Sequence, residues 1–550
     1  MHKMKETGSK IPDTIYVNGN VYTVNKHFER ACAFAVKGDR FIAVGSDEAI
    51  RSMAGSCTEI VDLEGKTVLP GMIESHIHME SMGMGLLEID AHDLTLDEIL
   101  AEVKKKYDDS SPDSWIRGDG WHESNWNAAS FPTKEDLDKV SPDKPVCIRR
   151  ACGHASWANS RALELAHITR DTPNPVGGEI LRDENGEATG MVTDAAQQFL
   201  FDVWPEYTYE ECKKADLLAQ EVFFRNGITT VHDAGSTPAM IKRWEDSYEA
   251  GDLKVRICGM FRAPGRPTYE QLLDQAGEYF KTGLKIGKFD NRLTVRSFKI
   301  SSDGSLGARS AWMLDDYSDR PGHKGNGKFT DEELYELVHL AADHNFQVVI
   351  HAIGDACNKQ ALDVFEAVFS ERPPYDHRFR IEHSQILRLE DIPRFAKLHV
   401  IPSMQPIAIG VDKTVAVSRV GEERIKGAYA WRSLIDAGSD VLPISSDAPI
   451  DPIYPLLNMC VAVTRKDRSG EPEGGWYKEM AMTRAEALKG ITINGAKASF
   501  EENLKGSIET GKLADFVVID QDVMTCPADD IKNTTVLRTV LGGETVYQAK

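Results

Sequence analysis

Short apolar runs separated by polar turns occupy the first part of the chain and predict β-strands. Residues 14–17 and 21–24 are two such runs, and the Asn18-Gly19-Asn20 turn between them is typical of a β-hairpin. The same pattern returns near the other end, at 515–520 and 534–540. We therefore predict one small β-domain made from both termini, with a first part at 14–68 and a second part at 505–550.

The region between these two parts, 69–504, alternates short apolar strands with stretches of helical periodicity. This alternation predicts βα units and a parallel sheet, and eight such units predict a closed (β/α)8 barrel. The expected strands lie at 72–77, 228–234, 255–261, 295–301, 347–352, 378–383, 399–404 and 441–446. The segment between the first two strands, 85–215, is unusually long and carries tryptophans and histidines. We expect it to be an inserted subdomain that covers the substrate.

Composition and charge exclude several classes of partner. The 64 Lys and Arg residues stand against 86 Asp and Glu, a net charge of −22, and no basic run is concentrated enough for a nucleic acid or an anionic membrane. No stretch approaches the length of apolar residues that spans a bilayer. Nine cysteines without a C-x-x-C pair indicate a reducing compartment, and the N-terminus lacks the apolar region of a signal peptide. We therefore expect a cytoplasmic protein.

Candidate chemistry is concentrated where the expected barrel strands end, which is where barrel active sites lie. The first strand finishes on His76-x-His78, and side chains two residues apart on an extended chain point the same way. The fifth strand ends on His351, the sixth on His383 and the eighth on Asp447. Histidine and aspartate are zinc ligands, so this set on one rim predicts a catalytic metal site with one position open to water.

Lys299 lies inside the apolar run of the fourth expected strand. A buried ammonium is costly and shifts toward its neutral form. Neutral lysine reacts with CO₂ to give a carbamate, whose two oxygens can bridge two metal ions. The alternative is that Lys299 extends to a neighbouring carboxylate such as Asp303. The residues alone leave both roles open.

These motifs together resemble the amidohydrolase superfamily, in particular amidohydrolase family 3, the branch of N-substituted formamide deformylase-like enzymes. The resemblance covers about residues 14–547. The matching pieces are Leu69-Pro70-Gly71 with His76-x-His78, Lys299-x-x-x-Asp303-Gly304-Ser305-Leu306-Gly307, His351-Ala352-Ile353-Gly354-Asp355, Ile381-Glu382-His383, Ser446-Asp447-Ala448-Pro449, Gly506-Ser507-Ile508-Glu509 and Gly511-Lys512-Leu513-Ala514-Asp515, with Gly120-Trp121 and Gly153-His154-x-x-x-x-Asn159 in the insertion.

The resemblance implies a distorted (β/α)8 TIM barrel with a small β-sandwich formed from both chain termini. It also implies that two divalent metal ions are bound, for which zinc is the expectation and iron or manganese remain open. Their ligands would be His76, His78, His351, His383 and Asp447. Carboxylated Lys299 would bridge the binuclear centre. The resemblance further implies a homodimer.

A centre of this kind predicts hydrolysis of a non-peptide C–N bond in a small molecule: an amide, an N-acyl amine or an N-formyl amine. A metal-activated hydroxide would attack the carbonyl, and Asp447 would accept its proton and pass it to the departing amine. In the insertion, His154, His122 and Trp121 are candidates for substrate contact, and His154 is a candidate for stabilising the developing negative charge. Arg309 either faces the substrate or pairs with a loop carboxylate.

Two other functions compete with this one. Deaminases of the superfamily, which act on amino-heterocycles, typically carry a glutamate three residues after the fifth-strand histidine and lack the fourth-strand lysine. This chain has Gly354 and Lys299 at those positions. A barrel used only as a scaffold would have lost metal ligands, whereas this chain keeps all six. Release of ammonia would identify a deaminase, and metal analysis would separate a scaffold from both enzymes.

Overall fold

The computed structural model describes residues 11–111, 114–123, 126, 131–265 and 267–550. It contains two compact units: Met1–Met79 together with Gln220–Lys550, and Glu80–Ala219. The N-terminal residues that argue against a signal peptide lie outside the described range. In the part of the chain that the structure describes, no helix combines the length and apolarity needed to cross a membrane.

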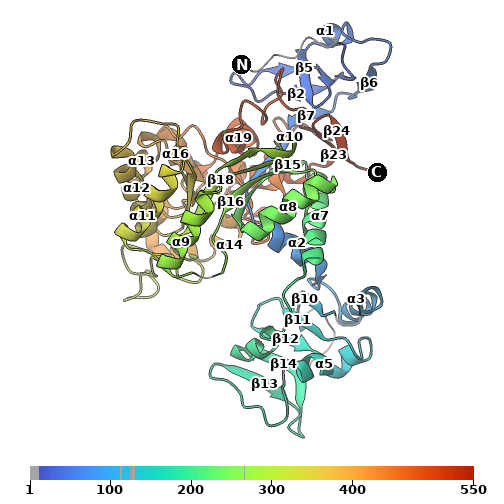
Figure 1. Ribbon diagram of the computed structural model, residues 1–550, viewed down its shortest axis with the longest axis vertical. Coiled ribbons are helices and arrows are strands. Elements are labelled where there is room, and N and C mark those ends of the chain that lie inside the picture. The colour runs from blue at the N-terminus through green and yellow to red at the C-terminus, as the bar shows by residue number, and fades with distance from the viewer. Residues whose placement is uncertain (1–10, 112–113, 124–125, 127–130, 266) are drawn as a thin grey trace. The chain divides into compact units, whose positions relative to one another are not determined.

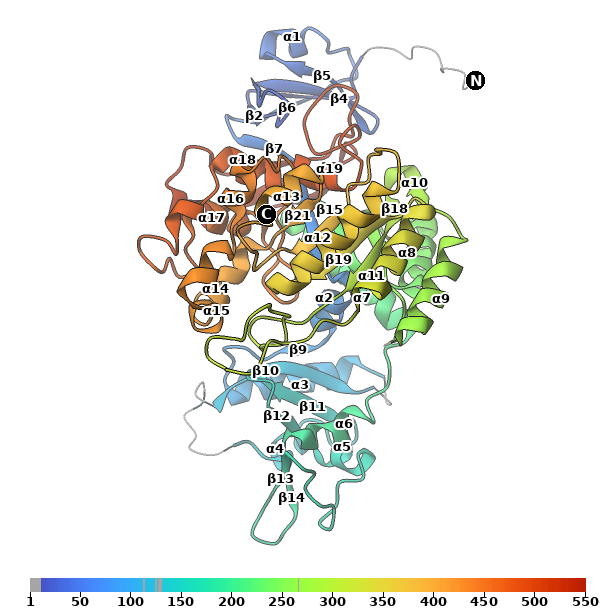
Figure 2. The same ribbon diagram turned by 90° about the vertical axis from the view of Figure 1, so that its left-hand side faces the viewer.

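A parallel sheet forms the centre of the first unit (Figures 1 and 2). Seven strands follow one another in the order β21-β20-β19-β18-β16-β15-β8, and each neighbouring pair is parallel. They are β8 (Met72–Ile77), β15 (Ile228–Ser236), β16 (Arg256–Phe261), β18 (Leu293–Ser301), β19 (Gln347–Ala352), β20 (Arg380–His383) and β21 (Ile401–Ser403). A short strand, β17 (Lys285–Gly287), pairs antiparallel with β18. The expected distorted α/β barrel is confirmed.

The prediction of a regular eighth strand at 441–446 is wrong. Backbone bonds join this segment to both neighbours: Ser445 N–H donates to Met404 O at 3.0 Å, and Asp447 N–H donates to His76 O at 3.1 Å. It forms only one isolated parallel bridge, between Met404 and Ile444. Proline has no N–H to give to a ladder, and Pro443 lies in the middle of the segment. The ring is therefore closed by an irregular segment between β21 and β8.

Amphipathic helices surround this sheet (Figure 1). In α11 (Asp331–Asp343), Leu334, Leu337 and Val338 are buried at helical spacing, and the side chain of Thr330 caps the first turn. The other helices that follow barrel strands are α8 (Pro238–Ala250), α9 (Tyr269–Phe280), α12 (Asp355–Ser370), α13 (Ile392–Lys397) and α16 (Trp431–Asp436). Shorter or later helices of this unit are α1 (Asp47–Arg51), α10 (Lys288–Asn291), α14 (Ile409–Asp412), α15 (Ala416–Arg424), α17 (Pro455–Thr464), α18 (Arg484–Gly490) and α19 (Ile493–Ala498).

The first unit has two further sheets, one made of N-terminal strands and one that combines strands from both termini. One has the order β5-β4-β1-β6 and the other β24-β23-β22-β7-β2-β3. A shared core of Phe34 and Phe41 from the first sheet and Phe516 and Val540 from the second joins them as a sandwich. The strands are β1 (Thr14–Val17), β2 (Asn20–Tyr22), β3 (Arg30–Ala31), β4 (Ala33–Lys37), β5 (Arg40–Gly45), β6 (Glu59–Asp62), β7 (Thr67–Pro70), β22 (Phe516–Ile519), β23 (Val536–Leu541) and β24 (Glu544–Gln548).

The second unit has its own sheet, in the order β13-β14-β12-β11-β10-β9. Cys147 and Ile148 are neighbours on β11 but belong to different hydrophobic clusters, because successive strand residues point to opposite faces. Both faces of the sheet are therefore buried. Its strands are β9 (Ile89–Asp90), β10 (Ile116–Trp121), β11 (Val146–Arg150), β12 (Ala155–Ala158), β13 (Gly178–Arg182) and β14 (Ala188–Asp194), and its helices include α3 (Leu96–Asp109), α4 (Lys134–Asp138), α5 (Ser160–Leu165) and α6 (Gln198–Phe201). Helices α2 (Met79–Leu87) and α7 (Tyr209–Arg225) contain the boundaries between the units.

Candidate metal centre

Three of the candidate ligands approach one another closely in the barrel. The ligand atoms of His76, His78 and Asp447 all lie within 4.8 Å of one another. Asp447 Oδ1 is 3.5 Å from His76 Nε2 and 3.3 Å from His78 Nε2. This carboxylate oxygen is buried and accepts no hydrogen bond from any described residue. A buried, unpartnered anionic oxygen facing two imidazoles fits a divalent cation, which supplies the missing positive charge.

His383 and His351 complete the group of histidines. The ring centroid of His383 is 5.0 Å from that of His76 and 4.5 Å from that of His351. His383 Nδ1 lies 2.7 Å from Gln405 Oε1, an acceptor, so Nδ1 carries the proton and Nε2 keeps its lone pair for a ligand bond. Burial lowers the pKa of His383 to about 3, which keeps the ring neutral, as a metal ligand must be. His351 Nε2 lies 3.2 Å from Gly304 O.

Lys299 is buried with its ammonium directed toward the same centre. Its Nζ lies 3.5 Å from His76 Nε2, and among the described residues no carboxylate oxygen lies within ion-pair distance of it. Burial lowers the pKa of Lys299 to about 8. Asp303 does not pair with it, because Asp303 accepts the N–H groups of Trp312 and Gly354. Asp303 instead anchors the loops beside His351.

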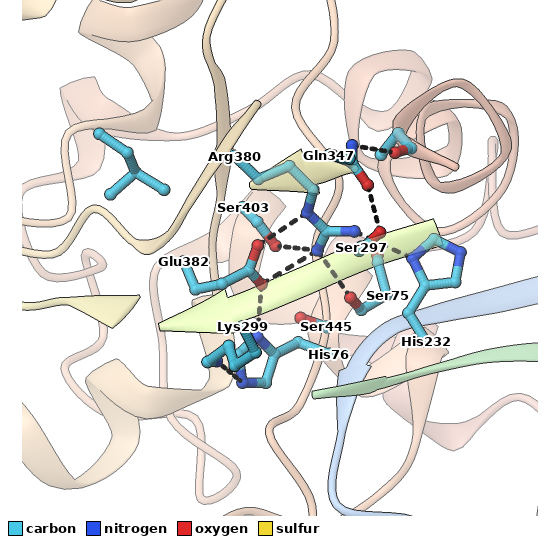
Figure 3. A network of polar contacts seen from close by, with 12 residues as sticks. Ser75, His76, His232, Ser297, Lys299, Gln347, Arg380, Glu382, Ser403 and Ser445 are labelled. Atoms are coloured by element: carbon cyan, nitrogen blue, oxygen red, sulfur yellow. Dashed lines mark hydrogen bonds and ion pairs between the residues drawn. The ribbon is translucent and has the colours of Figure 1, made fainter. Parts of the chain in front are cut away.

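A buried network supports His76 from behind (Figure 3). The Glu382 carboxylate contacts His76 Nδ1, and Arg380 binds both carboxylate oxygens, at 2.7 and 3.0 Å. Arg380 also donates to Ser75 O at 2.8 Å and to His232 Nδ1 at 3.1 Å. An acceptor at Nδ1 fixes the tautomer that leaves Nε2 free for a ligand bond. The network therefore orients His76 toward Lys299 and Asp447.

Four residues around this centre were not predicted from the sequence as site residues: Glu382, Arg380, Gln405 and Glu74. Glu74 lies two residues before His76 on β8 and is fully buried, and burial raises the pKa of its carboxyl to about 8. Its Oε1 accepts the N–H of Ser446. Period-two alternation would have found Glu74 from His76 and Arg380 from Glu382, because these pairs share a strand face. No local signal indicates Gln405.

A cavity of about 300 Å³ adjoins the centre within the first unit. His351, His383 and Asp447 line it, so candidate ligands face a space that a small molecule can enter. Its apolar lining includes Leu306, Ile353, Met404, Ala408 and Ile450.

The remaining sequence candidates have other surroundings. Arg309 makes two hydrogen bonds to Asp319, at 3.0 and 2.9 Å, which is the loop pairing considered as its alternative role. His154, His122 and Trp121 belong to the second unit. The side chain of His154 is exposed, and its Nδ1 lies 2.8 Å from Asp194 Oδ1.

His122 and Trp121 differ in their accessibility. His122 Nε2 lies 2.9 Å from Arg150 Nη2, and its side chain is 40% exposed. Trp121 is fully buried and donates its indole N–H to Ile148 O at 2.8 Å. Within its own unit, Trp121 is therefore a core residue.

Comparison with known proteins identifies the family of this chain. The sequence profile of the amidohydrolase family (Amidohydro_3) matches residues 59–547. The chain is 32% identical to the protein LONG AFTER FAR-RED 3 of Arabidopsis thaliana, over 98% of this chain and 92% of that protein. It is 30% identical to the N-substituted formamide deformylase of Arthrobacter pascens, over 98% and 99% of the two chains.

A solved structure agrees with these sequence relatives. The crystal structure of an uncharacterized metal-dependent hydrolase from Pyrococcus furiosus superposes with a TM-score of 0.75 at 28% identity, covering 93% of this chain and all of that one. The family profile covers most of the chain, and the relatives match it from end to end. The chain therefore belongs to the amidohydrolase family of metal-dependent hydrolases.

Proposed function

We propose that the protein hydrolyses a non-peptide C–N bond of an amide, an N-acyl amine or an N-formyl amine, giving an amine and a carboxylic acid. The observation that supports this most is the convergence of His76, His78 and the unpartnered Asp447 Oδ1. The similarity to a formamide deformylase over nearly the whole chain supports the choice of bond.

The proposed centre has two divalent cations, with zinc as the expected metal. His76, His78, His351, His383 and Asp447 would hold them, and Lys299 would bridge them as a carbamate formed from its amine and CO₂ with loss of a proton. The burial of Lys299 and the lack of a carboxylate beside it among the described residues support the carbamate. When bound, such cations lower the pKa of a coordinated water and polarise a carbonyl oxygen.

Asp447 has the role of proton carrier in this proposal. Its Oδ1 would take a proton from the attacking water and deliver it to the amine nitrogen as the C–N bond breaks. Burial opposes its ionisation, but the neighbouring His76 and His78 hold the pKa of this carboxyl well below its usual range. It is therefore ionised and able to accept a proton.

Residues of the second unit complete the proposal. His154 would donate a hydrogen bond to the developing oxyanion, and the Asp194 carboxylate at its Nδ1 would leave the Nε2 edge for that contact. His122 would contact the substrate. Trp121 is enclosed in the core of its unit, so its contribution would be to hold its neighbour His122 in place. Arg309, paired with Asp319, would shape the loop after β18 and so bear on the substrate indirectly.

Deamination of an amino-heterocycle is the second candidate. The presence of Lys299 and of Gly354, whose N–H donates to Asp303 at 2.8 Å, favours amide hydrolysis over it. A cytoplasmic location, expected from the cysteine pattern, and a homodimer, implied by the family resemblance, also belong to the proposal.

Product analysis tests the function directly. Zinc-loaded protein is incubated with N-formyl amines, N-acyl amines, cyclic amides and amino-heterocycles, and amine, acid and ammonia are quantified separately. We expect equal amounts of amine and carboxylic acid from at least one acyl or formyl amine. Release of ammonia from an amino-heterocycle alone would replace the proposal with deamination.

A further inference from the structure

Two carboxylates other than the candidate ligand Asp447 line the cavity beside the metal centre. They are Asp412, at the end of α14, and Asp451, four residues after Asp447. Neither belongs to a group of potential metal ligands among the described residues. The lining contains no lysine and no arginine. The wall of the cavity therefore carries negative charge that no lining cation balances.

Asp451 has no partner in the described part of the chain. No described donor bonds to its carboxylate, and no described cation lies within ion-pair distance of it. Of the described residues, Arg468 is the one cation that lowers the pKa of this carboxyl, and its influence is the weakest of those that act on it. Burial, followed by repulsion from Asp412 and Asp447, raises the pKa of Asp451 to about 6. The group is thus ionised near neutral pH but held in an unfavourable environment, which a bound cation would relieve.

The carboxylate of Asp412 is oriented by its neighbours, but only one of its two oxygens accepts hydrogen bonds from described residues. Its Oδ2 accepts the Tyr429 hydroxyl at 2.7 Å and the Gln385 amide at 2.9 Å, and both of these residues line the same cavity. Its Oδ1 accepts nothing from the described residues. Burial raises the pKa of the Asp412 carboxyl, the hydrogen bonds from Tyr429 and Gln385 partly offset this, and one oxygen remains free for a ligand.

The indole of Trp431 is a further polar group among the residues of the cavity wall. Trp431 lines the cavity and is fully buried, yet its Nε1–H has no acceptor among the described residues. Apolar side chains, including Leu306 and Ile450, complete the lining. This combination suits a ligand that has an apolar chain and a polar end.

We propose that Asp412 and Asp451 determine specificity by binding a cationic group, an ammonium or a guanidinium, at the end of the substrate remote from the scissile C–N bond. This inference rests on the proposed function, because it names the substrate class for the same centre. The substrate would be an N-acyl or N-formyl derivative of a diamine-like molecule, with a methylene chain along the apolar wall and the cation at the two carboxylates. Charge-assisted hydrogen bonds of this type are the stronger class in proteins.

A matched pair of substrates tests the inference. N-(4-aminobutyl)formamide carries a terminal ammonium, and N-pentylformamide replaces that ammonium with a methyl group of similar size. We expect the zinc-loaded enzyme to prefer the cationic compound in kcat/KM by about ten- to a hundredfold. Asp451→Asn should reduce this preference by about tenfold or more while leaving turnover of the neutral compound nearly unchanged, and Asp412→Asn should act in the same direction. Glu423→Gln, an exposed carboxylate, is the matched single-charge control.

A binding measurement separates the failure of this inference from the failure of the proposed function. Calorimetric titration of the metal-loaded protein with butylammonium and with butanol reports on the cation site without any reaction. Tighter binding of butylammonium that is lost in Asp451→Asn supports the site even if neither formamide is hydrolysed, in which case only the amide-hydrolase proposal fails. Equal or tighter binding of butanol, or a cation preference that survives both substitutions, overturns the inference.

Discussion

Single residues in unusual backbone conformations direct the candidate ligands. Alternation along β20 would turn His383 away from the face that carries Glu382, but His383 has a φ of 73°. Asp447 likewise has a φ of 61°. Left-handed conformations are uncommon for residues other than glycine and persist where the surrounding structure enforces them, often at functional sites. Here they bring two side chains into the centre that regular strands would not.

Lys299 gives the first prediction at this scale. Lys299→Ala should lose most of the bound metal and all measurable activity, because the bridging carbamate cannot form. Metal content by mass spectrometry and hydrolysis of the preferred amide check this, with circular dichroism to verify the fold. Lys397→Ala, which removes an exposed lysine, should change neither quantity. Wild-type turnover in Lys299→Ala would remove the lysine from the centre.

The second prediction concerns Asp447. Asp447→Asn keeps a ligand oxygen but cannot accept a proton, so the variant should retain part of its metal while kcat falls by about 10²–10⁴-fold. The comparison of metal content with kcat is decisive, because substitution of a residue that only binds metal would lower metal content and kcat together. Turnover near that of the wild type would exclude Asp447 as proton carrier.

At this scale the sequence predicted the donors better than their supports. His76, His78 and Asp447 were identifiable because each ends an apolar run, and the structure brings their ligand atoms together. Glu382 and Arg380 share one face of the short strand β20, so alternation identifies either of them only once the other is known. Gln405 reaches His383 from another strand end, a proximity that only the folded chain creates.

At the scale of elements, the barrel strands were predictable and the closing segment was not. β19 contains the apolar and buried run Val348-Val349-Ile350, as expected when both faces of a parallel sheet are buried. The segment at 441–446 has the same apolar character, but Pro443 denies it a regular ladder. The apolar residues correctly indicated that this segment is buried. Whether it forms a regular strand depends on the backbone N–H groups that it has available.

Glu382 and Arg380 both lie on β20, and a substitution of Glu382 tests whether this pair supports metal binding. Glu382→Gln should weaken zinc binding by about 10–100-fold, because the amide cannot accept from both Arg380 and His76 as the carboxylate does. Competition with a chelator measures this affinity. Glu366→Gln, in an exposed pair with Lys397, is the control and should leave it unchanged. An unaltered zinc affinity in Glu382→Gln would show that the network supports the strand and not the ligand.

At the scale of the whole molecule, the sandwich and the inserted unit follow from the order of elements along the chain. Strands from both termini share one core, and residues 80–219 fold around clusters of their own. The sequence indicated both features through the return of the β-pattern and the length of the insertion. It could not indicate that Trp121 is a core residue of that insertion, because a tryptophan beside two polar residues is equally typical of a binding surface.

Stability should depend on pH through His377 of the first unit. Burial lowers the pKa of His377 from 6.5 to about 4, and Phe379 N–H donates to its Nδ1 at 3.0 Å. The folded state keeps this ring neutral, whereas the unfolded chain takes up a proton below pH 6.5. The stabilising contribution is therefore complete above pH 6.5 and decreases by about 3 kcal/mol as the pH falls to 4.

Urea unfolding at several pH values checks this dependence. His377→Asn should flatten the loss of stability between pH 6.5 and 4, although it is less stable at neutral pH. An identical slope in the variant and the wild type would assign the pH dependence to other groups.

We propose that one binuclear, lysine-bridged centre lies at the strand ends of this barrel. Anomalous X-ray diffraction at the zinc edge, from crystals of the metal-loaded protein, tests it most directly. We expect two anomalous peaks among His76, His78, Lys299, His351, His383 and Asp447, with electron density for a carbamate continuing from Lys299 Nζ. A single peak, peaks elsewhere, or a lysine whose density ends at Nζ would contradict it.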